Sequence, residues 1–163
     1  MRVYVPSTPT ALAAVRRDAA VAPAPVSAYA VTAELRDWCG TEDAEELEYA
    51  ATVLAGRMSL ALLAGEDAGR PRRVVLAAEV PDAIVSAVPD LGPGAVLVDG
   101  TIPLKRVAAI HMDAEDAEPD VRAASTAAAA ARDGDAAAEA LVEAAEEHEL
   151  MWYATQELGD LID

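Results

Sequence analysis

The sequence predicts a single α/β domain: a mixed β-sheet of about five or six strands, packed by one long amphipathic helix and several shorter helices. Three observations support this fold. Apolar residues between Thr41 and Leu63 recur at spacings of three and four, the pattern of a helix with one apolar face. Short apolar segments of strand length alternate with helical segments along the chain. The 163 residues, 53% of them apolar, suit one domain, 1–163, with its own core.

The first elements are indicated by alternation and by capping residues. Residues Arg2–Pro6 alternate between apolar and other side chains and predict a strand. Thr8 suits the N-cap of a helix, because Pro9 fits the first helical position. We expect Leu12 and Val15 to anchor this helix in the core.

A second strand and a short helix follow a connector rich in proline and alanine. The strand is predicted over Val26–Thr32, and Thr32 can cap the helix that follows. Leu35 and Trp38 are its expected apolar anchors, and Gly40 ends it.

The long helix carries the clearest start signal in the chain. Acidic residues crowd its first turn, where the helix dipole favours negative charge. Thr41 or Asp43 can cap the free N–H groups, and Asp43 with Glu46 has the spacing of a capping box. We expect Leu47, Leu54 and Met58 to face the core. A set of small residues inside the helix would let another backbone approach closely: Ala51, Ala55, Gly56 and Ser59.

The second half of the chain contains the remaining strands. Arg72–Val80 has a continuous apolar centre, which predicts an interior strand covered on both faces. Pro81–Val88 is expected to form a short helix, whereas Ala95–Val98 and Val107–Met112 are expected strands. Leu150–Ala154 is predicted to be a short buried strand.

Residues 113–135 form an acidic, alanine-rich segment in which we expect mobility. Two helices are predicted around it, and the second should place Leu141 and Val142 inward. Alanine gives these helices high propensity but little area to bury.

The charge excludes several classes of partner. The net charge of −17 would repel nucleic acids, whose binding depends on cationic side chains, and anionic membrane surfaces.

The amino-terminal segment lacks the apolar core of a signal peptide, and no run of 18 apolar residues predicts a membrane span. A single cysteine, Cys39, rules out a disulfide within the chain. We therefore expect a cytoplasmic protein. The scarcity of Phe, Asn and Lys suits a bacterial genome of high GC content.

Four stretches together resemble a known family: MRVYVPS, EELEYAA, RRVVLAAEVP and HELMWYATQEL. The family consists of small actinobacterial proteins and is classed only as a domain of unknown function. The resemblance covers nearly the whole chain. It implies a bacterial cytosolic protein and supplies no activity, cofactor or site residue.

Two groups of residues are candidates for chemistry. His111 and Asp113 lie two apart at a strand end, so they share a face and could form an acid–base pair or contribute to a metal site. The simpler interpretation is a solvated strand end beside an acidic loop. We therefore assign no metal and no cofactor.

The second candidate lies near the carboxyl terminus. His148 and Glu149 precede Trp152 and Tyr153, and these four side chains could line a pocket. The aromatic residues could equally be the largest pieces of a core that lacks phenylalanine, and we expect Trp152 to be buried there.

Two functions remain open. The absence of CxxC, HExxH, GxSxG and glycine-rich phosphate-binding motifs favours a non-enzymatic interaction or regulatory protein whose partner is another protein. The alternative is a small-molecule-binding protein or enzyme with a pocket near His148, Trp152 and Tyr153. The sequence does not define the oligomeric state.

Overall fold

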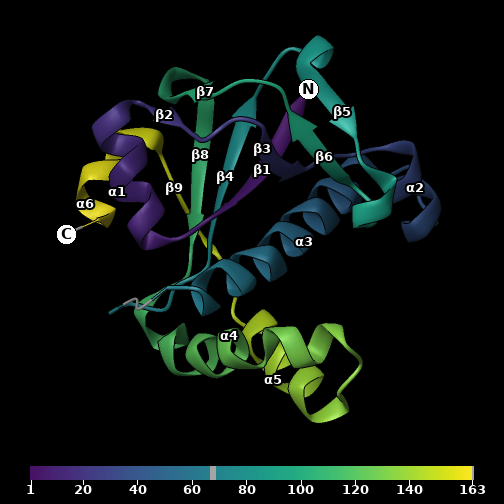
Figure 1. The fold of residues 1–163 in the computed structure, drawn as a ribbon, viewed down its shortest axis with the longest axis vertical. Helices are drawn as coiled ribbons and strands as arrows, with labels where there is room; N and C mark the ends of the chain where they lie inside the picture. Colours follow the sequence, from purple (N-terminus) through teal and green to yellow (C-terminus); the bar gives the residue numbers. More distant parts are fainter. Residues whose placement is uncertain (67–68, 163) are drawn as a thin grey trace.

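The computed structural model describes residues 1–66 and 69–162 and contains a seven-stranded antiparallel sheet in the order β5-β6-β3-β1-β4-β8-β9 (Figure 1). The strands are β1 (Arg2–Ser7), β3 (Val26–Tyr29), β4 (Val74–Glu79), β5 (Val85–Ala87), β6 (Ala95–Val98), β8 (Val107–Met112) and β9 (Met151–Tyr153). A separate two-stranded ribbon pairs β2 (Ala20–Val21) with β7 (Ile102–Pro103).

Six α-helices and five short 3₁₀ turns complete the part of the chain that the structure describes. The α-helices are α1 (Pro9–Asp18), α2 (Ala33–Cys39), α3 (Ala44–Ala64), α4 (Glu118–Arg132), α5 (Ala136–Glu146) and α6 (Leu158–Leu161). The 3₁₀ turns are η1 (Asp82–Ile84), η2 (Pro89–Leu91), η3 (Leu104–Arg106), η4 (Glu115–Ala117) and η5 (Thr155–Glu157).

The α/β class and the single domain are confirmed, but the prediction of a mixed sheet is wrong. Every strand pairing in the sheet is antiparallel. Helices α2 and α3 do connect two strands that run in the same direction, β3 and β4. However, β1 lies between these strands and runs the opposite way. The crossover therefore skips a strand and creates no parallel pair.

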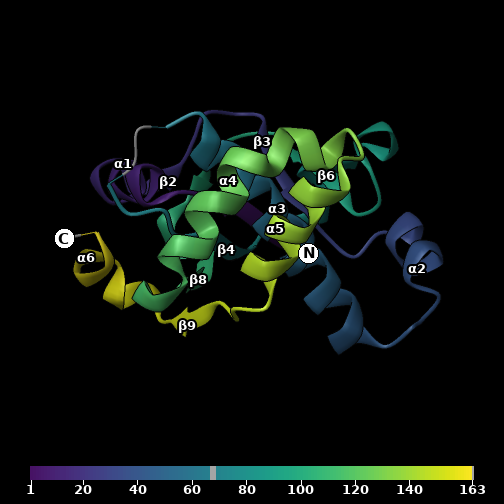
Figure 2. The ribbon, with the colours of Figure 1, turned by 90° about the horizontal axis from the view of Figure 1, so that it is seen from below.

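The domain has four layers. On one face of the sheet, α1, α6 and the β2–β7 ribbon cover a core that contains Val3, Val5, Leu12 and Leu158. On the other face lies α3, and the α4–α5 pair packs on the far side of α3 (Figures 1 and 2). Helix α3 thus lies between the sheet and a second helical layer.

The start signals of the first three helices are confirmed in atomic detail. The side chains of Thr8, Thr32 and Asp43 accept hydrogen bonds from the backbone N–H groups of Ala11, Leu35 and Glu46. Each bond satisfies an N–H group that has no partner inside its helix.

The predicted core face of α3 is only partly correct. Leu47 is buried, but Leu54 and Met58 are only partly buried. The fully buried positions are the small residues and the leucines on both sides of them: Leu47, Ala51, Ala55, Gly56, Ser59, Leu60 and Leu63. The helix has two packing partners, so its buried surface is wider than one stripe and is centred on its small residues.

Ser59 explains the close approach of α3 to the sheet. Its hydroxyl donates to the carbonyl oxygen of Ser7 in β1 at 2.7 Å and accepts from the N–H of Val74 in β4 at 3.0 Å. One side chain therefore joins the helix to two adjacent strands. The expectation that small residues permit a close backbone approach is confirmed at this position.

Three local predictions are corrected. Pro81–Val88 is not a helix: it forms the 3₁₀ turn η1 and then β5, an edge strand of three residues that gives the sheet its seventh strand. Trp38 is exposed and not an anchor of α2. Leu141 is exposed, and Ala138, Val142 and Ala145 face inward from α5.

Helix α3 is also the one helix, among the residues described, long and apolar enough by length and composition to cross a membrane. In the structure this helix packs between the sheet and the α4–α5 pair.

Candidate functional site

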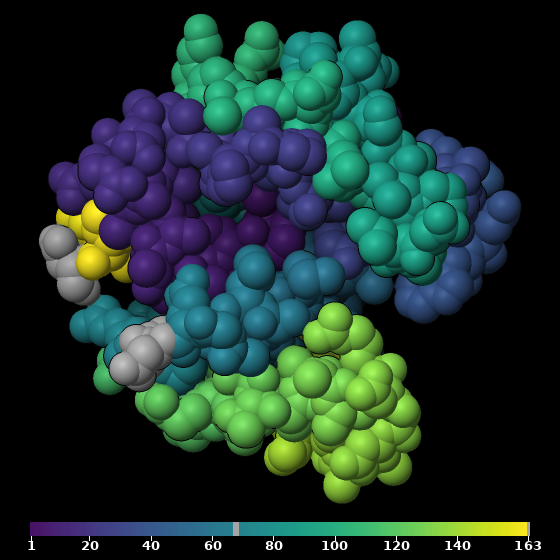
Figure 3. Space-filling view, viewed as in Figure 1, coloured from purple at the N-terminus to yellow at the C-terminus, as the bar shows by residue number. Residues whose placement is uncertain are grey.

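A cleft of about 1020 Å³ opens between α1, α3 and strand β3. Its walls are mainly apolar and come from β1, β3, α1 and α3, with the margins formed by α4, α5 and η2. Figure 3 shows the surface hollowed between the amino-terminal segment and α3. Clefts of about 300–1,000 Å³ with apolar walls and a few polar groups are typical ligand sites.

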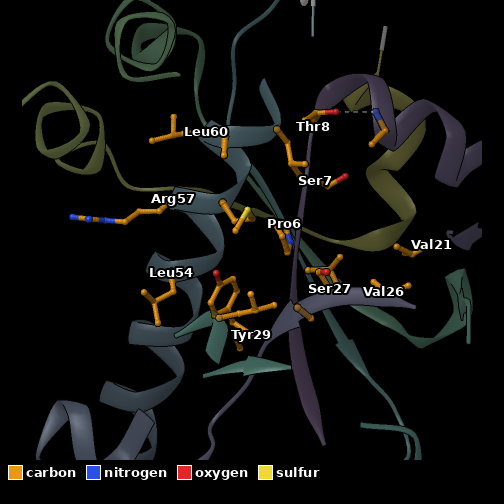
Figure 4. Close-up of a pocket in the computed structure, with 18 of the residues that line it drawn as sticks. Pro6, Ser7, Thr8, Val21, Val26, Ser27, Tyr29, Leu54, Arg57 and Leu60 are labelled. Atoms are coloured by element: carbon orange, nitrogen blue, oxygen red, sulfur yellow. Dashed lines mark hydrogen bonds between the residues drawn. The ribbon is translucent and has the colours of Figure 1, made fainter. Parts of the chain in front are cut away.

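The cleft arises where two strands diverge. Strand β1 pairs with β4 along all six residues from Arg2 to Ser7, but its register with β3 has one paired position, Tyr4 opposite Tyr29. Beyond that position Val5, Pro6 and Ser7 lie on one side of the gap, and Val26 and Ser27 lie on the other. The gap between these strands forms the floor of the cleft (Figure 4).

Alanine-rich helices keep the cleft open. Alanine side chains line it from three helices: Ala11 and Ala14 in α1, Ala61 in α3, and Ala128 and Ala131 in α4. A methyl group fills little of the space between packed elements, so a composition rich in alanine leaves room that leucine or phenylalanine would occupy.

One end of the cleft contains a hydrogen-bonded polar pair, Thr8 and Glu66. The Thr8 hydroxyl donates to Oε1 of Glu66 at 2.9 Å and accepts from the N–H of Ala11 at 3.0 Å. The second carboxylate oxygen of Glu66 is buried and has no hydrogen-bond partner among the residues described. This end carries negative charge and offers no free donor from Thr8.

The other end contains Tyr29, Ser27 and two arginines. Figure 4 shows the Tyr29 hydroxyl pointing into the cleft near Leu54 of α3. Burial raises the pKa of Tyr29, and the positive charge of Arg132 partly opposes the increase. The Arg57 guanidinium donates to Glu139 at 3.0 Å and to Glu146 at 2.8 Å, so α5 already neutralises it.

Three of the six residues singled out from sequence lie elsewhere, around a second cavity of about 210 Å³. His111, His148 and Glu149 line this cavity together with Arg73 and Gly56. The structure thus brings three of the six candidates together. Trp152, Tyr153 and Asp113 are not among the residues that line the cavity.

Asp113 has a different partner from the one expected. Its carboxylate, which is fully buried, accepts from Nε and Nη2 of Arg73 at 2.9 and 2.7 Å and from the N–H of Arg73 at 2.7 Å. The same Nη2 donates to the carbonyl oxygen of His148 at 2.8 Å. A two-point, charge-assisted pair of this kind fixes the Asp113 carboxylate in place as a structural group. The prediction of a solvated strand end is wrong at Asp113.

The two histidines have different surroundings. Burial, and then the charge of Arg2, lowers the pKa of His111. His148 Nε2 lies 2.7 Å from Oδ2 of Asp120 in α4. No group of three or more His, Cys, Asp or Glu side chains that could hold a metal occurs in residues 1–66 and 69–162.

Trp152 is 62% exposed, so the prediction that it docks in the core is wrong. Strand β9 forms as expected but lies at the sheet edge, paired to β8 with Trp152 opposite His111. An edge strand has a neighbouring strand on one side only. The side chain of Trp152 in this edge strand is exposed to solvent. Tyr153, on the other face, packs partly buried against the α1-side core.

We expect Trp152→Ala to change the free energy of unfolding by less than about 0.5 kcal/mol, as exposed substitutions do. Urea denaturation of the variant and the wild type measures this difference. A loss of about 3 kcal/mol or more, on the scale of a buried aromatic residue, would mean that Trp152 packs in the core in solution.

Sequence reasoning missed the large cleft. Its polar residues are far apart in the chain. They come from elements whose spatial arrangement cannot be read from neighbouring residues in the sequence. The alanine content and the divergence after Tyr29 create the space, and only the first of these is visible in the sequence.

The fold and the cleft define a small, single-domain α/β protein with an open antiparallel sheet and a ligand-sized cleft. Residues 1–162 match a family of unknown function (DUF6912), and the chain belongs to that family. This confirms the family of unknown function that the sequence resemblance indicated. No curated protein and no solved structure matches the chain significantly.

Proposed function

We propose that this protein binds an apolar small molecule in the cleft between α1, α3 and β3. The observation that carries the proposal is the combination of a volume of about 1020 Å³ with mainly apolar walls and a few polar groups at its ends. An unfilled apolar surface of this size is costly in water, and a ligand that covers it gains hydrophobic free energy. On composition alone, we propose a bacterial, cytoplasmic setting.

A neutral apolar dye tests this function. N-phenyl-1-naphthylamine fluoresces more strongly in apolar surroundings, so titration into the protein should give a saturable rise in fluorescence. Ala14→Phe, which fills the cleft from α1, is expected to weaken dye binding about tenfold or more.

The matched control is Ala13→Phe, which adds the same side chain on the same helix at an exposed position outside the cleft. It should bind the dye like the wild type. The absence of saturable binding, or equal effects of the two variants, would contradict binding in the cleft.

The second candidate is the non-enzymatic interaction protein expected from the sequence. The exposed Met151 and Trp152 on the edge strand β9 favour it, because exposed apolar side chains beside unpaired strand groups suit a protein partner. An affinity pull-down with the wild type and Trp152→Ala distinguishes the two functions. Under the second function Trp152→Ala loses the captured protein, whereas Ala14→Phe retains it.

A further inference from the structure

The two ends of the cleft differ in charge, and this difference selects a ligand. At the α1 end, Glu66 presents a carboxylate whose neighbour Thr8 has already used its hydroxyl hydrogen. That end repels an anionic group, and the Thr8 hydroxyl has no hydrogen left to donate to one. An apolar ligand with one charged group would therefore place an anion at the opposite end.

Arg132 supplies the positive charge at that opposite end. Two arginines line the cleft, and Arg57 binds Glu139 and Glu146. Arg132 has no carboxylate partner within the described ranges 1–66 and 69–162, although the chain carries 29 acidic residues against 12 basic ones. A guanidinium without a carboxylate on the rim of an apolar cleft is suited to bind one from a ligand.

Tyr29 adds a hydrogen-bond donor at the same end. Its hydroxyl makes no hydrogen bond to a described residue and points into the cleft (Figure 4). Tyr29 and Arg132 both line the cleft, and the positive charge of Arg132 partly opposes the rise in the pKa of Tyr29 that burial causes. Burial keeps the phenol protonated, so it donates to an incoming oxygen and does not compete with it for the arginine.

Three other acidic residues line the cleft, and two of them already have an arginine partner. Asp18 binds Arg17 and Glu139 binds Arg57. Asp90 is exposed on η2. The walls between the two ends are apolar and include Val15, Val21 and Val26.

We propose that the ligand of the cleft has an apolar body and one terminal carboxylate, bound by the Tyr29 hydroxyl and the Arg132 guanidinium. The apolar body then extends over the divergence of β1 and β3 toward Val15 and Val21. This assignment rests on the proposed binding function and adds the chemical class of the ligand.

The test is displacement of the neutral dye by three ligands that share one alkyl chain: decanoate, 1-decanol and decylamine, each below its micelle concentration. We expect decanoate to displace the dye most strongly, with half-displacement at a concentration about tenfold lower than that needed for decylamine. Tyr29→Phe and Arg132→Gln should each weaken decanoate about tenfold and leave decanol unchanged.

Arg122→Gln is the matched control. It removes the same charge from the exposed surface of the same helix, away from the cleft, and should leave decanoate binding unchanged. Arg132 is exposed, so its variant retains the packed core and keeps the test valid if Tyr29→Phe destabilises the domain.

Several results would overturn the carboxylate assignment while the cleft still binds the dye. These are displacement by decylamine or decanol as strong as by decanoate, or an Arg132→Gln variant that binds decanoate like Arg122→Gln. A wild type that does not bind the dye contradicts the binding function itself.

Discussion

Asp113→Asn is expected to destabilise the protein by about 3–5 kcal/mol. Asp113 is fully buried and Arg73 is 5% exposed, so neither charge is solvated by water in the folded state. Removal of the carboxylate charge leaves the Arg73 guanidinium buried without a counter-charge. This loss is a large part of the roughly 5–15 kcal/mol that typically separates folded and unfolded domains.

A double variant separates the cost of an unpaired charge from the value of the pair. Arg73→Met with Asp113→Asn removes both charges, and the new side-chain amide oxygen at position 113 can still accept from the backbone N–H at position 73. Urea denaturation should find the double variant more stable than Asp113→Asn alone, because no uncompensated charge remains. If the double variant loses as much stability as the two single substitutions together, the two residues act independently.

Leu76→Ala is expected to cost about 2–5 kcal/mol, the range for a buried leucine that leaves a cavity. Leu76 is 1% exposed in β4, which pairs with β1 on one side and β8 on the other. It belongs to the core beneath α1 and α6. A position between two paired strands has little freedom to relax around the lost side chain, so the cavity persists.

The matched control is Leu91→Ala, because Leu91 is 64% exposed on η2. The same chemical change there should shift the free energy of unfolding by less than about 0.5 kcal/mol. Similar denaturation midpoints for the two variants would mean that β4 is not the central packed strand in solution.

The sequence predicted best what depends on neighbouring residues. The caps at Thr8 and Thr32 were correctly identified, and Asp43 was one of two candidates with Thr41, because a cap and its N–H partner lie within three positions of each other. The interior strand β4 was also identified, since its continuous apolar run reflects burial on both faces. The length of α3 followed from its periodicity.

The predictions that were wrong concern features that depend on distant segments of the chain. The buried surface of α3 is centred on Ser59 because two separate layers pack against it, and no periodicity within α3 records the second layer. Trp152 has the apolar character of a core residue, but its burial depends on whether another element covers β9. Antiparallel order was missed for the same reason, since β1 lies between strands that follow it in the chain.

The sequence did not predict that the two groups of candidate residues meet. His111, His148 and Glu149 line one cavity because β8 pairs with the segment that follows α5. The burial of Asp113 required Arg73, which is 40 positions away in the chain. The large cleft had no local signal, since it is a space between elements and not a cluster of reactive side chains.

The single paired position between β1 and β3 divides the sheet into two leaves. One leaf contains β5, β6 and β3, and the other contains β1, β4, β8 and β9. Few interstrand hydrogen bonds cross the seam, so the leaves resist shear far less there than along the six-residue ladder of β1 with β4. The weakest mechanical line of the sheet therefore runs along the floor of the cleft.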